Sequence, residues 1–243
     1  MKRLILLIQF LTRIPININL SVTREDLSKS IIYFPIVGYI IGMFLALFYK
    51  FSIFYFDKII IAFLVIIIEI IITGGLHIDG LSDTVDGIYS GREKEKIIEI
   101  MKDPNVGTFG VLSIIILVIF KFLLIYKIDN NLFIILLMMP VFSRFCSVFS
   151  SRIGNYPKKD GLGNIFIGQV NNYQLLISFI FTLPLLYLNF LIYIAFIINI
   201  IFTYFFVKYI TKKIDGITGD TLGAMVEVNE LLFLLIIYIM GVL

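Results

Sequence analysis

Residues 59–76 read IIIAFLVIIIEIIITGGL, and they continue directly into His77-Ile78-Asp79-Gly80-Leu81-Ser82-Asp83-Thr84-Val85-Asp86-Gly87. A mostly apolar run of about 20 residues is long enough to cross a bilayer as a helix. Across the whole chain, 60% of the 243 residues are apolar, 15% are charged, and the mean hydropathy is +1.02. A soluble domain has about 45–50% apolar and about 25% charged residues. The composition excludes a soluble fold, disorder, a disulfide scaffold and a basic nucleic-acid-binding surface, and it predicts an integral membrane protein.

Similar apolar runs predict about seven spans in an all-α fold. The short apolar stretch 4–11 lies between cationic residues, so we expect it to be retained and to lie in the membrane interface. The last run begins with polar residues, so six spans and a partly re-entrant end remain open. We expect residues 1–243 to form one polytopic membrane domain. The predicted spans are 31–49, 59–76, 106–126, 132–150, 173–188, 190–207 and 222–243, with a tight hairpin at Asn189 between the fifth and the sixth.

Lysine and arginine are distributed unevenly between the predicted loops. Fifteen of the 20 fall in residues 1–30 and in the second-to-third, fourth-to-fifth and sixth-to-seventh connections, whereas the alternate connections hold three. Because cytoplasmic loops carry the excess of cations, this pattern predicts a cytoplasmic N-terminus in the cell (inner) membrane. It also predicts that segments 77–110, 152–172 and 208–230 form a catalytic side that faces the cytoplasm.

The densest polar cluster follows the second span. If the helix continues, Asp79, Asp83 and Asp86 stand at i, i+4 and i+7 on one face, where their charges repel one another. A hard divalent cation with oxygen ligands offsets such repulsion, and Mg²⁺ typically binds a few carboxylates together with substrate phosphates. The cluster therefore favours phosphoryl transfer over a solvated acidic helix end. Gly80 and Gly87 would allow a phosphate or another backbone to approach closely.

Several polar residues near this cluster are weaker candidates. His77, the single histidine, fits either a proton relay or a structural hydrogen bond. Ser90-Gly91-Arg92-Glu93 is typical of a capping box that opens an amphipathic helix over 92–102, with Arg92 near the carboxylates. Asp103-Pro104 predicts the N-cap and first residue of the third span, while Lys102, Gly107 and Gly110 fit an anion site at that helix start.

The remaining charged candidates lie further along the chain. The glycine-rich connection 152–172 fits either a nucleotide grip or a flexible cationic loop. Asp220 and Glu227 stand at i and i+7 on a helix that enters the membrane, where carboxylates are costly and mark function. Within the spans, Lys121 and Arg144 are expected to pair internally with Glu69 or to face a wet cavity. Gly38 and Gly42 predict close helix packing.

Three of these motifs together resemble the cobalamin synthase family, whose members are adenosylcobinamide-GDP ribazoletransferases. They are residues 77–87, the stretch 101–110, and Gly219-Asp220-Thr221-Leu222-Gly223-Ala224 with Glu227. The opening Phe10-Leu11-Thr12-Arg13-Ile14-Pro15 is similar to the N-terminal signature of that family. The likeness covers the whole chain, and Ser82 departs from it where a small residue such as Ala is expected.

The resemblance implies a Mg²⁺-dependent transfer in the last steps of cobalamin biosynthesis. The 3′-hydroxyl of α-ribazole, or of its 5′-phosphate, attacks the cobinamide-linked phosphate of adenosylcobinamide-GDP, and GMP leaves. We expect Asp79, Asp83 and Asp86 to bind Mg²⁺ and, with His77, to form the catalytic group, one aspartate serving as the base. We expect the substrates and phosphates to be bound by Arg13, Arg92, Lys102, Asp103, Gly107, Asp220 and Glu227.

The expected partners are these small molecules and the lipid bilayer, without nucleic acid; a homo-oligomer is left open. Two other functions are also considered. A CDP-alcohol phosphotransferase uses clustered membrane aspartates and Mg²⁺, but Ser82-Asp83 stands where its signature has Ala-Arg. A transporter would use Glu69, Lys121 and Arg144 as a pathway, but the chain shows no convincing internal repeat.

Overall fold

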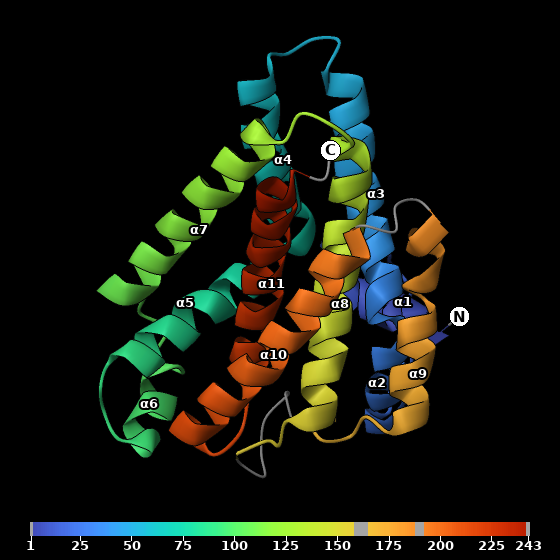
Figure 1. Cartoon of the computed structure of the whole chain (residues 1–243). Coiled ribbons are helices and arrows are strands. Elements are labelled where there is room, and N and C mark those ends of the chain that lie inside the picture. Colours follow the sequence, from blue (N-terminus) through green and yellow to red (C-terminus); the bar gives the residue numbers. More distant parts are fainter. Residues whose placement is uncertain (1, 158–164, 188–191, 242–243) are drawn as a thin grey trace.

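The computed structural model describes residues 2–157, 165–187 and 192–241, and every regular element in these ranges is a helix (Figure 1). This confirms the predicted all-α membrane fold. The elements are α1 (Lys2–Leu11), α2 (Arg24–Ser30), η1 (Ile31–Tyr33), α3 (Phe34–Ser52), α4 (Lys58–Thr73), α5 (Leu76–Tyr89), α6 (Lys94–Ile100), α7 (Thr108–Lys127), α8 (Leu132–Ile153), α9 (Asn172–Ile180), η3 (Leu183–Tyr187), α10 (Ile192–Ile214) and α11 (Gly219–Met240).

Five helical segments in the described part of the chain are long and apolar enough to cross a membrane, and α4 with α5 makes a sixth if the bent pair counts as one span. The predicted count of seven is not confirmed. The predicted span 173–188 is short here, because α9 ends at Ile180 and the chain continues as the 3₁₀ helix η3. The predicted hairpin at Asn189 lies outside the described residues, as do residues 158–164 of the glycine-rich connection 152–172.

The second predicted span ends in a sharp corner, which lays α5 at 91° to α4. Gly74 and Gly75 adopt left-handed φ values of 64° and 72°, a conformation that only glycine visits without strain. The amide of Arg13 donates to the carbonyl of Ile72 at 2.7 Å, which satisfies one of the carbonyls left over at the helix end. The Arg13 side chain lies directly against Gly74, so any Cβ there would collide with it. We therefore treat α4 as the membrane-crossing part and α5 as lying outside the spans.

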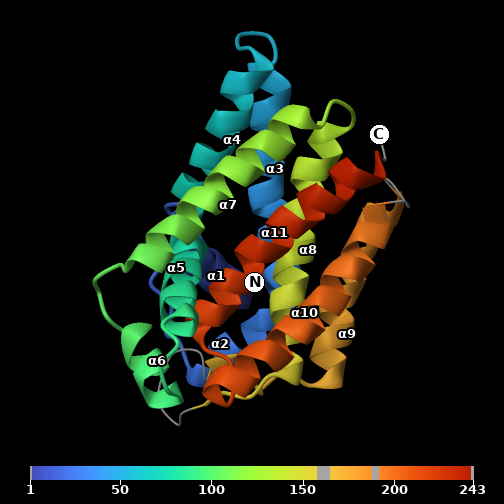
Figure 2. The ribbon, with the colours of Figure 1, turned by 60° about the vertical axis from the view of Figure 1, so that its left-hand side comes forward.

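The connections of the bundle gather at two opposite ends (Figures 1 and 2). The turns 53–57 and 128–131 lie at the upper end in Figure 1, whereas α6 and the connections 90–107 and 215–218 lie at the lower end. Lys94 of α6 forms an ion pair with Asp215, which joins two of the lower connections. Two of the connections predicted to lie on one side of the membrane, 90–107 and 215–218, therefore share one end of the molecule.

Helix α8 lies at the centre of the packing and is buried along almost its whole length. Gly38 and Gly42 of α3 face the α8 backbone, and a Cβ on Gly38 would stand 2.5 Å from the carbonyl oxygen of Pro140. The predicted close packing at these glycines is confirmed. On another side of α8, the Phe142 ring stacks on Phe196 of α10 at 4.2 Å between ring centroids.

A buried ion network joins four helices in the middle of the bundle. The Nζ of Lys121 on α7 lies 3.3 Å from Glu69 of α4, 2.8 Å from Glu227 of α11 and 2.6 Å from Glu230 of α11. Arg144 of α8 donates from Nη1 to the other Glu230 oxygen at 2.9 Å. These side chains are almost completely buried, so water does not solvate their charges. Each charge is instead stabilised by its ion-pair partners. The predicted pairing of Lys121 with Glu69 is confirmed, whereas Arg144 pairs with Glu230 instead of Glu69.

We predict that Lys121→Met destabilises the fold strongly. The substitution keeps the side-chain length but leaves three buried carboxylates facing Arg144 alone, and breaking a buried ion pair costs about 3–5 kcal/mol. The measurement is thermal unfolding of the purified protein in detergent, followed by circular dichroism. Lys127→Met, at the exposed end of the same helix, is the matched control and should unfold like the unmodified chain. Equal unfolding temperatures for the two variants would contradict the role of this network.

Candidate active site

Helix α5 carries the three predicted aspartates on one face, as the i, i+4, i+7 spacing required. Their exposure differs along the helix: Asp79 is exposed, Asp83 is half-buried and Asp86 is buried. The three side chains therefore meet different surroundings, although they share one helix face.

The N-terminus of α11 adds a fourth carboxylate, Asp220, to this face. Burial, and then the negative charges of Asp79, Asp220 and Asp86, raise the pKa of Asp83 to about 7. Gly80 makes this approach possible, since a Cβ there would stand 2.6 Å from the carbonyl oxygen of Asp220. We call Asp79, Asp83 and Asp220 the acidic face. Its unfavourable charge repulsion is the property that a bound cation would relieve.

Asp86 is already engaged by the protein itself. Its two carboxylate oxygens accept the backbone N–H groups of Gly107 at 2.7 Å and Gly110 at 2.8 Å, at the start of α7. The sequence predicts an anion site at the start of α7, and in the structure the Asp86 carboxylate occupies that position. These two hydrogen bonds join α5 to α7 through the Asp86 side chain. Asp86 therefore fits the role of a structural contact better than that of a metal or phosphate ligand.

The stretch before α7 differs from the sequence-based prediction. The helix begins at Thr108 with Gly107 as its N-cap, so Asp103 is not the cap of this span. Instead, the Asp103 carboxylate accepts hydrogen bonds from the backbone and side-chain N–H groups of Asn105, at 2.9 and 2.7 Å. These bonds stabilise a local turn that precedes the first residue of α7. The helix predicted over 92–102 forms as α6, with Glu93 rather than Ser90 at its N-cap position.

The predicted cationic residues lie exposed around α5. Arg13 covers the corner at Gly74 where α5 begins, and Arg92 follows the end of α5 at residue 89. Lys102 is exposed on the connection to α7, and its positive charge acts on Asp220. The structure therefore leaves all three cations accessible to a ligand that approaches α5.

A cavity of about 220 Å³ lies beside the acidic face, and we call it the His77 cavity. His77 is buried, and its Nε2 has no hydrogen-bond partner within the described chain. Burial, followed by the positive charge of Arg144, lowers the pKa of His77 to about 3, so the ring is neutral. The cavity is lined by Phe10, Leu11, Phe34, Leu76, His77, Asp79, Gly80, Ser147, Phe166, Gly219, Asp220, Leu222, Gly223 and Val226.

Glu227 does not reach the acidic face. It lies two turns further along α11 than Asp220 and accepts from Lys121 in the buried network described above. The free-energy cost of burying this carboxylate was interpreted from the sequence as a sign of substrate binding. In the structure, the ion pair with Lys121 offsets that cost. Glu230 belongs to the same network and was not singled out from the sequence, although its i+3 spacing from Glu227 places both on one helix face.

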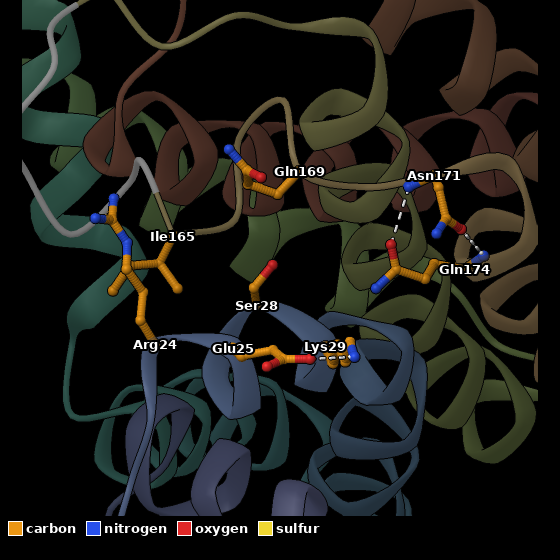
Figure 3. Close-up of a pocket in the computed structure, with 8 residues that line it drawn as sticks. All are labelled: Arg24, Glu25, Ser28, Lys29, Ile165, Gln169, Asn171 and Gln174. Carbon is orange, nitrogen blue, oxygen red and sulfur yellow. Dashed lines mark hydrogen bonds and ion pairs between the residues drawn. The ribbon is translucent and has the colours of Figure 1, made fainter.

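A second, more open pocket includes Ile165, Gln169 and Asn171 of the predicted catalytic-side segment 152–172, but none of the individually predicted site residues (Figure 3). It is formed by α2 and the chain just before and within α9, and most of its polar groups are paired with one another. Lys29 forms an ion pair with Glu25, and Asn171 and Gln174 cap α9 reciprocally. These internal pairs leave few groups for a ligand, so we place the candidate site at the acidic face.

Among residues 2–157, 165–187 and 192–241, no group of three or more His, Cys, Asp or Glu side chains is gathered closely enough to hold a metal ion. Asp79, Asp83 and Asp220 interact through their charges without forming a closed ligand cage. Such a face fits a cation that takes one or two carboxylates from the protein and further oxygens from a phosphate ligand or water, as Mg²⁺ commonly does.

Comparisons with known proteins agree on one family. A family model described as cobalamin-5-phosphate synthase matches residues 3–238. A relative from Clostridioides difficile (strain 630), named adenosylcobinamide-GDP ribazoletransferase, is 39% identical over 253 residues that cover 99% of this chain and 98% of the relative. A relative of the same name from Clostridium novyi (strain NT) is 41% identical over 247 residues, covering 97% of this chain and 96% of the relative. No solved structure matches this chain.

We predict that Gly80→Ala separates α5 from α11 and damages both stability and turnover. The new methyl group would lie against the Asp220 backbone, and overpacking of this kind costs about 1–3 kcal/mol. The measurement is the unfolding temperature in detergent, with turnover recorded in parallel. Gly219→Ala is a matched control for stability, because a Cβ there meets no atom within 4 Å. A Gly80→Ala protein as stable as this control would show that the helices do not depend on that contact.

Proposed function

The chain belongs to the cobalamin-5-phosphate synthase family, and from that premise we propose which of its residues perform the family's reaction. The protein is a membrane-embedded transferase of cobalamin biosynthesis, which joins a ribazole to adenosylcobinamide-GDP. The observation that carries our assignment is the acidic face of Asp79, Asp83 and Asp220, which adjoins a cavity at the end of the bundle.

We assign binding of Mg²⁺ to the acidic face. When bound, Mg²⁺ would neutralise negative charge on the diphosphate and hold it for in-line attack. Asp79, Asp83 and Asp220 provide accessible carboxylate oxygens, whereas Asp86 is held by the amides of α7 and Glu227 by Lys121. We therefore assign the sequence-predicted roles of Asp86 and Glu227 to positioning: they fix α7 and α11 relative to α5.

The transfer exchanges one phosphorus–oxygen bond for another. The 3′-hydroxyl oxygen of α-ribazole, or of its 5′-phosphate, attacks the phosphorus next to cobinamide, and a new P–O bond forms. The P–O bond to GMP breaks, and GMP leaves with the bridging oxygen. The hydroxyl proton passes to a carboxylate of the acidic face, which is close to the cavity where the acceptor enters. Orientation of the two substrates supplies much of the rate.

The exposed cations flank this site and are assigned to the leaving nucleotide. Lys102 is close enough to Asp220 for their charges to interact, and the arginines at the two ends of α5 bracket the acidic face. Positive charge here would stabilise the negative charge that develops on GMP. We assign this end of the bundle to the cytoplasmic side of the inner membrane, because the connections richest in lysine and arginine lie there.

The family match over residues 3–238 is the reason for preferring this function to a CDP-alcohol phosphotransferase or a transporter. The intramembrane charges on which a transporter would depend are paired with one another in the bundle interior. Adenosylcobinamide-GDP and the ribazole are the small-molecule partners in this proposal, and lipid covers the exposed apolar faces of the spans.

We predict that Asp83→Asn lowers turnover by at least about a hundredfold while the protein remains folded in the membrane, because a neutral amide holds neither metal nor proton. The assay incubates purified protein with adenosylcobinamide-GDP, α-ribazole and Mg²⁺ and measures GMP and the corrinoid product. Asp129→Asn, at the opposite end of the bundle, is the matched control and should retain full turnover. An Asp83→Asn enzyme with normal turnover would exclude Asp83 from the chemistry.

We predict that chelation of divalent cations stops turnover and that added Mg²⁺ restores it. Because the acidic face lacks a closed ligand cage, Mg²⁺ should bind weakly to the protein alone and more tightly once the diphosphate substrate is present. Isothermal titration with Mg²⁺, with and without adenosylcobinamide-GDP, measures this difference. Chelator already saturated with Mg²⁺ is the control. Undiminished turnover in excess chelator would contradict the assignment.

A further inference from the structure

Three phenylalanine rings from distant parts of the chain meet at the His77 cavity. The Phe166 ring lies 5.9 Å from that of Phe10 on α1 and 5.6 Å from that of Phe34 on α3, measured between centroids, and the second pair meets edge to face. All three residues line the cavity. Aromatic walls in such tilted and edge-on geometry favour a further aromatic ring between or beside them.

The cavity has few polar groups besides its acidic rim. His77 and Ser147 line it, but both residues are buried, and the His77 Nε2 has almost no accessible surface. A ligand in the cavity therefore meets a mostly apolar wall, against which an unpaired polar group would be costly.

The cavity is small and adjoins the acids directly. Its volume of about 220 Å³ lies below the roughly 300 Å³ at which pockets begin to enclose a drug-sized ligand. It therefore has room for one compact ring system, and the rest of a larger ligand must extend outward. Asp79 and Asp220 line the same cavity, so a group attached to the ring would emerge at the acidic face.

We propose that the His77 cavity binds the aromatic base of the ribazole acceptor, stacked among Phe10, Phe34 and Phe166. This inference rests on the proposed function, because it assigns one substrate of that reaction to one part of the site. It makes the three phenylalanines binding residues for the acceptor. It also explains how the sugar hydroxyl reaches the acidic face, since the sugar follows the base out of the cavity.

Guanine fits the same cavity poorly. Its edge carries an exocyclic amine and a carbonyl, and each would need a hydrogen-bond partner that the aromatic walls do not offer. The benzimidazole base of a ribazole has no exocyclic polar group, so its apolar body can lie against the phenylalanines. The cavity should therefore distinguish the acceptor from the guanine nucleotide of the other substrate.

A fluorescence titration tests this assignment without turnover. The chain has no tryptophan, so Phe10→Trp places a single indole at the cavity wall of the full-length protein in lipid nanodiscs. The probe is benzimidazole, which has no sugar and cannot react. We expect a saturable change in indole emission with benzimidazole and none with guanosine. Phe205→Trp, exposed on α10, is the matched control and should not respond.

A kinetic split provides the second test. Phe166→Ala removes one wall of the cavity and should raise the KM for α-ribazole about tenfold, in line with the cost of losing base–aromatic stacking. The KM for adenosylcobinamide-GDP should stay within about twofold, because the acidic face remains intact. A merely structural role for Phe166 would change both constants or the unfolding temperature instead.

The outcomes separate this inference from the proposed function. Saturable binding of benzimidazole supports the cavity assignment even if no GMP is released, a result that would overturn the reaction alone. GMP release with no response to benzimidazole and an unchanged KM for α-ribazole in Phe166→Ala would overturn the cavity assignment alone. An indole response to oleate that benzimidazole does not displace would also overturn it, because the cavity would then hold an acyl chain.

Discussion

The pairing of Lys121 with Glu69, Glu227 and Glu230 is the interaction on which the rest of the structure depends. It joins α4, α7 and α11, the same three helices whose ends build the site: α4 leads into α5, α7 begins against Asp86, and Asp220 lies in the first turn of α11. These charges lie in the interior of the bundle, where no water can replace a lost ion-pair partner. The helices that carry them can therefore shift little relative to one another. A fixed centre thus holds three helix ends together at the acidic face.

The corner at Gly74 and Gly75 determines where the aspartates lie. Had α5 continued straight on from α4, Asp86 would stand about 20 Å beyond Thr73, at 1.5 Å per residue, away from the other helices. The 91° bend lays α5 across the end of the bundle, where Asp86 meets the amides of α7 and Gly80 meets the backbone of Asp220. A local backbone preference of two glycines thereby brings together residues that are far apart in the sequence.

Features that depend on local periodicity could be predicted from the sequence, and features that depend on tertiary pairing could not. The i, i+4, i+7 spacing correctly placed three aspartates on one helix face, and the apolar runs located the long helices. The same reasoning wrongly predicted a full span over 173–188 and an N-cap role for Asp103. Hydropathy does not show that α9 ends at Ile180, or that Asp103 forms a turn with Asn105. It also did not predict that Phe10, Phe34 and Phe166 line one cavity, because no spacing links rings that meet only in the folded chain.

The two kinds of buried carboxylate show how structural and chemical acids differ in a membrane enzyme. Asp86 and Glu227 have donors at hydrogen-bond distance, so their charges are satisfied before any substrate arrives. Asp79, Asp83 and Asp220 repel one another instead, and burial together with this repulsion raises the pKa of Asp83. Repulsion between carboxylates is costly, and a cation bound between them would relieve it. The mutually repelling acids therefore define the place where a cation and a diphosphate should bind.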